Sequence, residues 1–138
     1  MTPLFKKLNF KQQKEIFILN YPAEFDKEYK EMKHYAAIKT NIENSKGIEF
    51  ILTFVTSKYD VDRIVPAILK KLKQDGIIWF AYPKGSSKKY KAEINRDNGW
   101  DVLVKSGFET VRAVAIDEDW SALRFRRSEF IKSNKPMK

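Results

Sequence analysis

Side chains that could bind a ligand follow the ends of the apolar runs in this sequence. The runs at 16–19, 48–55 and 77–82 predict strands, and each gives way to hydroxyl, amide or lysine side chains. Because the carboxyl ends of parallel strands meet at one edge of a sheet, we expect these side chains to lie together there. A lysine, hydroxyls and free backbone amides suit a small anionic or polar ligand. The candidate ligand-binding residues are Tyr21, Ser57, Lys84, Gly85, Ser86, Asp117, Trp120 and Ser121.

The residue types that are missing exclude several kinds of chemistry. The chain has no cysteine and a single histidine, so disulfides, thiolate metal sites, cysteine nucleophiles and histidine-cluster metal sites are excluded. That histidine, His34, is expected at the surface and far from the other candidates, which leaves no Ser-His-Asp arrangement. Lys84 precedes Gly85, whereas a phosphate-binding P-loop places its lysine after the glycine. The sequence therefore predicts no catalytic residues of a familiar type, no metal and no cofactor.

Charge is unevenly distributed along the chain. There are 27 Lys and Arg against 18 Asp and Glu, a net charge of +9. Residues 84–96 carry five basic side chains and one acidic, and residues 124–138 carry six and one, so these segments account for the whole excess. Such segments can contact nucleic acid or another anionic partner. No nucleic-acid motif accompanies them, so we expect solvated segments and keep nucleic acid as the less favoured partner.

Composition indicates one folded domain. With 138 residues, of which 43% are hydrophobic and 14% aromatic, the chain can bury a core. No stretch approaches the ~20 apolar residues of a membrane span, and the first residues lack the apolar run of a secretory signal. We therefore expect a cytoplasmic protein with one α/β domain over 1–127 and a basic, flexible tail over 128–138.

Periodicity predicts strands that alternate with helices. Strands are expected at 16–19, 36–42, 48–55, 77–82, 111–116 and 121–127. Helices are expected at 26–32, 60–74 and 97–106. Asp60 is expected to cap the second helix and Gly76 to end it, and Val104 is expected to point inward from the third. Residues 117–120 are too few for a parallel crossover, so the last two strands must pair antiparallel. The prediction is a three-layer α/β domain, a mostly parallel sheet that ends in an antiparallel hairpin, with Trp79 and Trp100 in its core.

The order of elements from residue 48 onward resembles the second half of the Rossmann-like methyltransferase fold, which ends in such a hairpin. The resemblance implies that strand 121–127 lies between strands 77–82 and 111–116. Methyltransferases of this fold carry a glycine-rich turn after the first strand, whereas this chain has no glycine between Met1 and Lys46. The acidic residue for the cofactor ribose also has no clear counterpart. Adenosylmethionine is therefore not expected to bind in the usual mode.

Several short motifs resemble a family of small bacterial proteins of unknown function. They are LNYP at 19–22, GIIWFAYPK at 76–84, NRD at 95–97, AID at 115–117 and WSALRF at 120–125. As a set they cover most of the chain. The resemblance implies a shared fold and supplies no mechanism.

Three functions remain open on the sequence alone. The favoured prediction is a non-catalytic protein that binds a small anionic or polar ligand at the carboxyl edge of the sheet. One alternative is a nucleic-acid-associated accessory protein that uses loop 84–96 and the tail. The other is an enzyme with a noncanonical site near Lys84 and Asp117. A steep salt dependence of oligonucleotide affinity would favour the nucleic-acid alternative.

Overall fold

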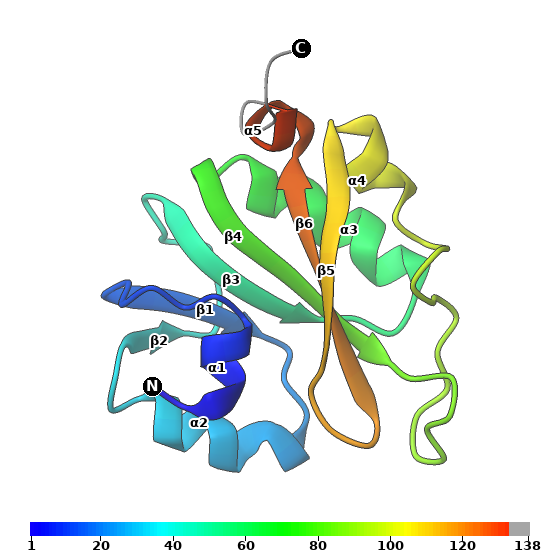
Figure 1. Ribbon diagram of the computed structural model, residues 1–138, viewed down its shortest axis with the longest axis horizontal. Helices are drawn as coiled ribbons and strands as arrows, with labels where there is room; N and C mark the ends of the chain where they lie inside the picture. The colour runs from blue at the N-terminus through cyan, green and yellow to red at the C-terminus, as the bar shows by residue number, and fades with distance from the viewer. Residues whose placement is uncertain (133–138) are drawn as a thin grey trace.

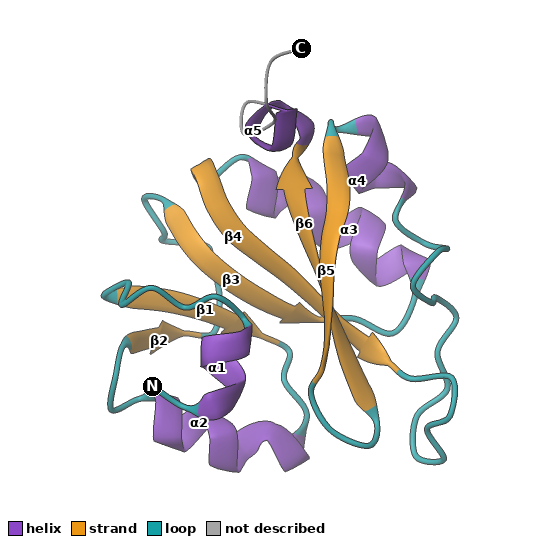
Figure 2. Cartoon of the chain, viewed as in Figure 1, coloured by secondary structure: helices purple, strands orange, loops and turns teal. Residues whose placement is uncertain are grey.

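The computed structural model describes residues 1–132, which form a six-stranded sheet of order β2-β1-β3-β4-β6-β5 (Figures 1 and 2). The strands are β1 (Glu15–Leu19), β2 (Ala37–Lys39), β3 (Ile48–Phe54), β4 (Leu72–Pro83), β5 (Phe108–Ala115) and β6 (Trp120–Arg127). β2, β1, β3 and β4 are parallel, and β6 runs antiparallel between β4 and β5. The predicted mostly parallel sheet, its terminal antiparallel hairpin and the place of the last strand are all confirmed.

Helices cover both faces of the sheet, which gives the three predicted layers (Figure 2). One face packs against α1 (Pro3–Lys7), the 3-10 turn η1 (Ala23–Phe25) and α2 (Asp26–Met32). The other packs against α3 (Lys58–Leu69) and α4 (Asp101–Lys105). A last short helix, α5 (Ser128–Lys132), follows β6.

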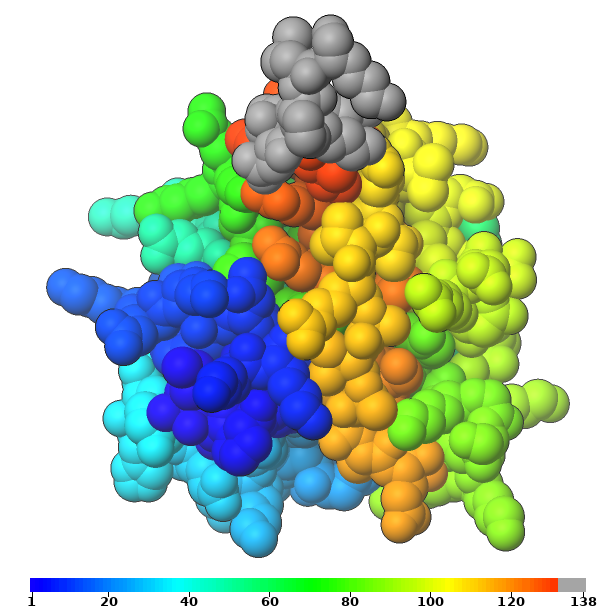
Figure 3. Space-filling model, in the orientation of Figure 1, coloured from blue at the N-terminus to red at the C-terminus, as the bar shows by residue number. Residues whose placement is uncertain are grey.

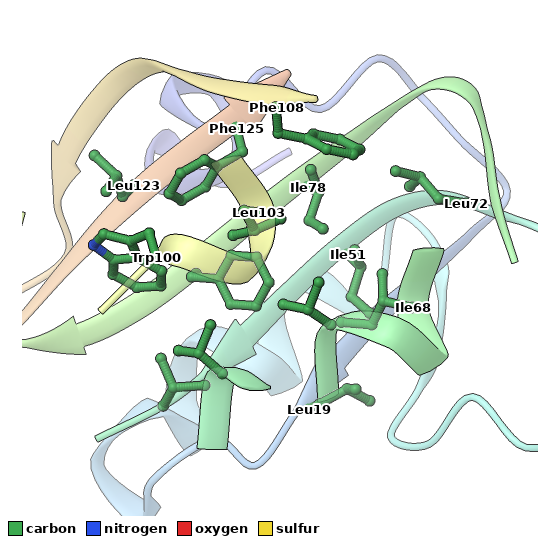
Figure 4. Packing of buried hydrophobic residues seen from close by; sticks show 14 of the residues in the cluster. Leu19, Ile51, Ile68, Leu72, Ile78, Trp100, Leu103, Phe108, Leu123 and Phe125 are labelled. Atoms are coloured by element: carbon green, nitrogen blue, oxygen red, sulfur yellow. The ribbon is translucent and has the colours of Figure 1, made fainter. Parts of the chain in front are cut away.

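The central strands β3 and β4 are apolar on both faces because each face meets a helical layer. Ile51 and Ile78 lie in the layer that contains α3 and α4 (Figure 4), whereas Phe50 and Trp79 face α1, and all four are fully buried. The Trp79 indole N–H donates a 2.8 Å hydrogen bond to the carbonyl oxygen of Leu8. This bond attaches the segment after α1 to the centre of the sheet.

The helix expected at 60–74 begins and ends earlier than predicted. Ser57 is the N-cap of α3, and its hydroxyl accepts a 3.1 Å hydrogen bond from the backbone N–H of Asp60. Gly76 was expected to end this helix, but it lies inside β4. A Cβ there would lie 2.9 Å from the carbonyl oxygen of Ile48, so the glycine permits close packing of two strands. In the sequence, a glycine that ends a helix cannot be distinguished from a glycine inside the strand that follows the helix.

The helix expected at 97–106 is also shorter. The side chain of Asn95 accepts hydrogen bonds from two backbone N–H groups that follow it, which makes a turn where a helix was predicted. Trp100 is buried as expected, and its indole N–H donates a 2.8 Å hydrogen bond to the carbonyl of Asn95. Val104 was expected to point inward, but it is 64% exposed because α4 is too short to cover more of the sheet.

The N-terminal helix α1 was not predicted. Thr2 caps it by accepting a 3.2 Å hydrogen bond from the backbone N–H of Phe5, and Pro3 occupies its first turn. Phe5 is fully buried against the sheet. In contrast, the expected edge strand at 36–42 is present as β2, which pairs with β1 only.

The predicted flexible tail is described in part. Residues 128–132 form α5, and residues 133–138 lie outside the described part of the chain. Among the described residues, no helix has the length and apolar character needed to cross a membrane.

Candidate functional site

A crevice opens at the carboxyl edge of the sheet, where the strand order reverses. β1 is joined to β2 through α2 on one face, whereas β3 is joined to β4 through α3 on the other. Ligands of open α/β sheets bind outside the carboxyl ends of the strands at such a switch point. The crevice between β1 and β3 has a volume of ≈300 Å³. Its lining residues are Asn20, Phe54, Val55, Thr56, Asp60, Arg63, Ile64 and Trp120.

The polar wall of the crevice comes mainly from the start of α3. The Asp60 carboxylate accepts hydrogen bonds from the backbone N–H (3.0 Å) and the hydroxyl (3.1 Å) of Thr56. Arg63 lies one turn further along α3 and brings a guanidinium to the same crevice. Asn20 has a φ of 59°, a left-handed conformation that asparagine tolerates, and it turns the chain away from β1.

A second cluster holds a carboxylate at the start of the helical segment after β1. Glu24 accepts 3.2 Å hydrogen bonds from the ammonium of Lys89 and from the indole N–H of Trp120, and a further one from Tyr90. Burial acts to raise the pKa of Glu24, but these hydrogen bonds and one from its own backbone N–H outweigh burial and lower the pKa to about 2. Glu24 therefore binds the loop after β4 as an anion.

Trp120 separates this cluster from the crevice. Trp120 is 3% exposed, and its ring packs edge-on against Phe54, with 5.0 Å between ring centroids, and in a tilted arrangement against Tyr90, at 4.9 Å. The Ser87 hydroxyl also donates a 2.8 Å hydrogen bond to the Asp119 carboxylate in the β5–β6 turn. Hydrogen bonds to Glu24 and Asp119 and the ring contact between Tyr90 and Trp120 therefore hold the loop after β4 against the edge of the sheet.

The predicted ligand-binding residues lie at the carboxyl edge, but only Trp120 among them lines the crevice. Ser57 caps α3. The Asp117 carboxylate accepts 2.8 Å hydrogen bonds from the backbone N–H groups of Asp119 and Trp120, which fixes the hairpin turn.

The other predicted residues have different surroundings. Tyr21 stacks on a tyrosine of α2, with 4.8 Å between ring centroids, and burial raises its pKa. Lys84 and Gly85 line a separate groove of ≈480 Å³ along the loop after β4. Ser86 is exposed, and Ser121 lies in the ladder between β4 and β6.

The sequence placed Asn20 and Thr56 in the loops at the strand ends but did not mark them as ligand-binding, it gave Asp60 only a capping role, and it missed Arg63. The four-residue spacing of Thr56 and Asp60 at a helix start was a usable signal. Glu24 is separated from its partner Lys89 by 65 residues, and no local pattern connects them.

In the part of the chain that the structure describes, no group of three or more His, Asp or Glu side chains is placed to hold a metal ion.

Replacing Glu24 by glutamine is expected to lower the free energy of unfolding by about 1–2 kcal/mol near neutral pH. A fall in pKa from 4.5 to about 2 corresponds to at most about 3 kcal/mol, and exposure of the side chain reduces this. Because the pKa is lowered in the folded state, this stabilisation is complete above about pH 4.5 and is lost as the pH falls toward about 2.

Urea unfolding of the wild type and Glu24→Gln at about pH 7 and about pH 3 checks this expectation. The difference in stability should shrink at the lower pH. Glu118→Gln, which changes an exposed acid in the β5–β6 turn, is the matched control and should have little effect at either pH. An equal difference at both pH values would contradict the proposed role of the Glu24 charge.

Comparison with solved structures identifies the fold. The chain matches a SAM dependent methyltransferase from Aquifex aeolicus with a TM-score of 0.56 and 11% identity, over 88% of this chain and 86% of that chain. It matches the B. subtilis M1A22 tRNA methyltransferase TrmK with a TM-score of 0.56 and 10% identity, over 91% and 65%. The chain has the Rossmann-like methyltransferase fold. The fibrillarin pre-rRNA processing protein of Methanococcus jannaschii also matches, with a TM-score of 0.53 and 15% identity, over 85% and 67%.

No family model and no curated protein matches the sequence. The predicted resemblance to the methyltransferase fold is confirmed, whereas the resemblance to a family of small bacterial proteins stays a prediction. The comparison overturns the prediction of a non-catalytic protein, because solved structures that share the methyltransferase fold are described as enzymes. The enzyme alternative fits them better.

The residues after β1 do not fit adenosylmethionine in the usual mode of this fold. The turn contains Pro22, which has no N–H to offer, in place of a glycine. The Glu24 carboxylate occupies the start of the helical segment, where a ligand carboxylate would otherwise meet free N–H groups, and like charges repel. β2 ends at Lys39, whereas a ribose would need a carboxylate there.

Proposed function

We propose that this chain is a group-transfer enzyme that acts on a small anionic substrate in the crevice between β1 and β3. The observation that carries the proposal is the convergence of Thr56, Asp60 and Arg63 at the switch point of the sheet. The methyltransferase fold supports it, since the Aquifex and B. subtilis proteins of this fold are described as transferring methyl groups.

Each polar residue of the crevice has a role in this proposal. Arg63 binds the anionic part of the substrate, because a guanidinium pairs with carboxylate or phosphate through two parallel hydrogen bonds. Asp60 accepts the proton that a substrate hydroxyl or amine loses as its oxygen or nitrogen bonds to the group of a second, electrophilic donor molecule, while the donor's bond to that group breaks and its electron pair leaves with the rest of the donor. The two hydrogen bonds from Thr56 hold Asp60 in place. Phe54 and Trp120 form an apolar wall that orients the substrate.

The proposed site differs from the one expected near Lys84 and Asp117. The Asp117 carboxylate accepts hydrogen bonds from two backbone N–H groups of its own turn, so its role is to stabilise the hairpin. Asp60 lies in the crevice itself and is half-buried. A carboxylate at a switch point is better placed for proton transfer than one in a turn.

The test is the conversion of small molecules by the purified protein. A metabolite extract is incubated with the wild type, Asp60→Asn or Arg63→Gln, with and without added adenosylmethionine, and its components are compared by mass spectrometry. We expect a compound that the wild type consumes and that the Asp60→Asn variant consumes at least about 100-fold more slowly. Arg63→Gln should weaken the apparent affinity for the same compound.

Lys105→Gln, at the end of α4 and outside the crevice, is the control and should match the wild type. Absence of any conversion, or conversion that both crevice variants retain, would contradict the proposal. Conversion that requires added adenosylmethionine would support the proposed enzyme activity and would show that adenosylmethionine binds despite Glu24 and Pro22.

A further inference from the structure

The basic loop after β4 is neutralised by the surroundings that the fold gives it. Residues 84–96 carry five basic side chains and one acidic. Lys89 pairs with Glu24, and the loop also contacts the β5–β6 turn, which holds three consecutive acids at 117–119. Glu24, the three acids of the turn and Glu93 together equal the five basic groups of the loop in number. The loop after β4 and its neighbours therefore carry no net positive charge that would attract a polyanion.

The opposite, amino edge of the sheet carries an excess of positive charge. Two open cavities lie there, of ≈590 Å³ and ≈430 Å³, and they adjoin each other, since Glu49 and Lys73 line both. Arg126 lies beside the smaller cavity, because its guanidinium donates two hydrogen bonds, of 2.7 and 3.0 Å, to the carboxylate of Asp75 in the lining. The basic edge, as we define it, consists of Lys11, Lys14, Lys46, Lys73 and Arg126 at the amino edge, together with Lys39, which lines the larger cavity from the end of the short edge strand β2.

Acidic groups offset only part of this charge. The acids that line the two cavities are Glu15, Glu49 and Asp75, which leaves three more basic than acidic groups. Glu49 lies 3.4 Å from Lys73, and both side chains are more than half exposed, so this pair is weak and open to exchange. A polyanion could therefore replace Glu49 as the partner of Lys73.

The basic side chains follow one another across neighbouring strands. The segments before β1, before β3 and at the start of β4 form adjacent parts of the left margin in Figure 3. Arg126 lies on β6, the next strand after β4. Three strand spacings of ~4.8 Å place about 14 Å between the first and last of these positions. One carboxylate or phosphate cannot span that distance, whereas consecutive phosphates of a nucleic acid can.

The remaining lining favours a nucleic acid over a protein or a membrane. Asn41, Asn44 and Ser45 add polar hydrogen-bonding groups that suit phosphate and sugar oxygens. The exposed large apolar side chains in the described part of the chain are Met1, Tyr35, Tyr59, Val104 and Val111, and none lines either cavity. A protein interface needs an apolar core, and membrane insertion needs an apolar wedge.

We propose that the basic edge binds the sugar-phosphate backbone of a nucleic acid. The site is separate from the crevice and does not depend on the proposed enzyme activity. The contact is to the backbone, so it is expected to be insensitive to base sequence and to weaken steeply with salt. Three to four neutralised phosphates give a slope of about −3 for log affinity against log salt concentration.

The test is fluorescence anisotropy with a labelled single-stranded RNA of about 20 nucleotides and a DNA duplex of about 20 base pairs, titrated at several salt concentrations. One triple variant changes Lys14, Lys46 and Lys73 to glutamine. The matched control changes Lys88, Lys91 and Arg96 to glutamine, which removes the same net charge from the loop after β4. We expect the first variant to lose about tenfold or more in affinity and the control about twofold at most.

Several outcomes would overturn the proposal. They are no measurable binding of either oligonucleotide at low salt, an equal loss in both triple variants, and a larger loss in the control. Vesicles that contain phosphatidylserine serve as a second anionic probe. Binding to the vesicles that exceeds binding to both oligonucleotides would assign the basic edge to a lipid surface instead. Circular dichroism of each variant checks that the fold is retained.

Discussion

Trp79→Ala is expected to lower the free energy of unfolding by about 3–5 kcal/mol, the largest effect of any substitution considered for this protein. The side chain is fully buried in β4 against the layer that contains α1. Its removal leaves a cavity and also leaves the Leu8 carbonyl oxygen without the 2.8 Å hydrogen bond from the indole. Urea unfolding followed by circular dichroism measures the loss.

Trp79→Phe separates the two contributions. Phenylalanine keeps most of the apolar contact and loses the hydrogen bond, so we expect a smaller loss of about 1–2 kcal/mol. Tyr59→Ala, at a 68% exposed aromatic on α3, is the control and should change stability by less than about 0.5 kcal/mol. A loss below about 1 kcal/mol for Trp79→Ala would show that this side chain is not central to the core.

Trp120→Ala is expected to lower the free energy of unfolding by about 3 kcal/mol or more and to loosen the loop after β4. The indole is buried between Phe54 and Tyr90 and donates to the Glu24 carboxylate. Its removal takes away the wall that separates the crevice from the Glu24 cluster. Backbone amides at 84–96 should therefore exchange with solvent faster than in the wild type.

Hydrogen exchange followed by mass spectrometry measures this local effect, with two comparisons. Trp120→Phe keeps the ring packing and loses the bond to Glu24, so it should produce a smaller increase in exchange. Trp79→Ala removes a side chain from a different part of the core and destabilises the whole domain. It should not raise the exchange rate of residues 84–96 more than that of the rest of the chain. If Trp120→Ala lowers stability while exchange in that loop changes no more than elsewhere, the loop is held by other contacts.

The architecture was largely predictable from local patterns. The apolar runs at 48–55 and 77–82 lack polar alternation, and only strands covered on both faces have that composition. The short link at 117–120 forced an antiparallel hairpin. Element boundaries were less predictable, because Gly76 permits close strand packing while resembling a helix stop, and because Asn95 makes a turn where a helix start was expected.

The candidate site was only partly predictable. The rule that strand ends gather at one edge correctly placed Trp120 there. It could not indicate that the crevice lies between β1 and β3, since that depends on the order in which strands pair. Thr56 and Asp60 are four residues apart, and their contact is local. The ion pair between Glu24 and Lys89 joins residues that are 65 positions apart. No local sequence pattern predicts such a contact.

The class of fold, the absence of thiol chemistry and the size of the charge excess follow from composition and short-range periodicity, so the sequence was enough to establish them. The place where that charge acts depends on the folded chain. Along the chain, residues 84–96 stand out as basic, yet folding brings Glu24 and the acids of 117–119 beside them. The lysines that precede β1 and β3, scattered in the sequence, gather at the amino edge. Electrostatic attraction depends on distance through space, so charges that are far apart in the sequence cancel or add only once the sheet has formed.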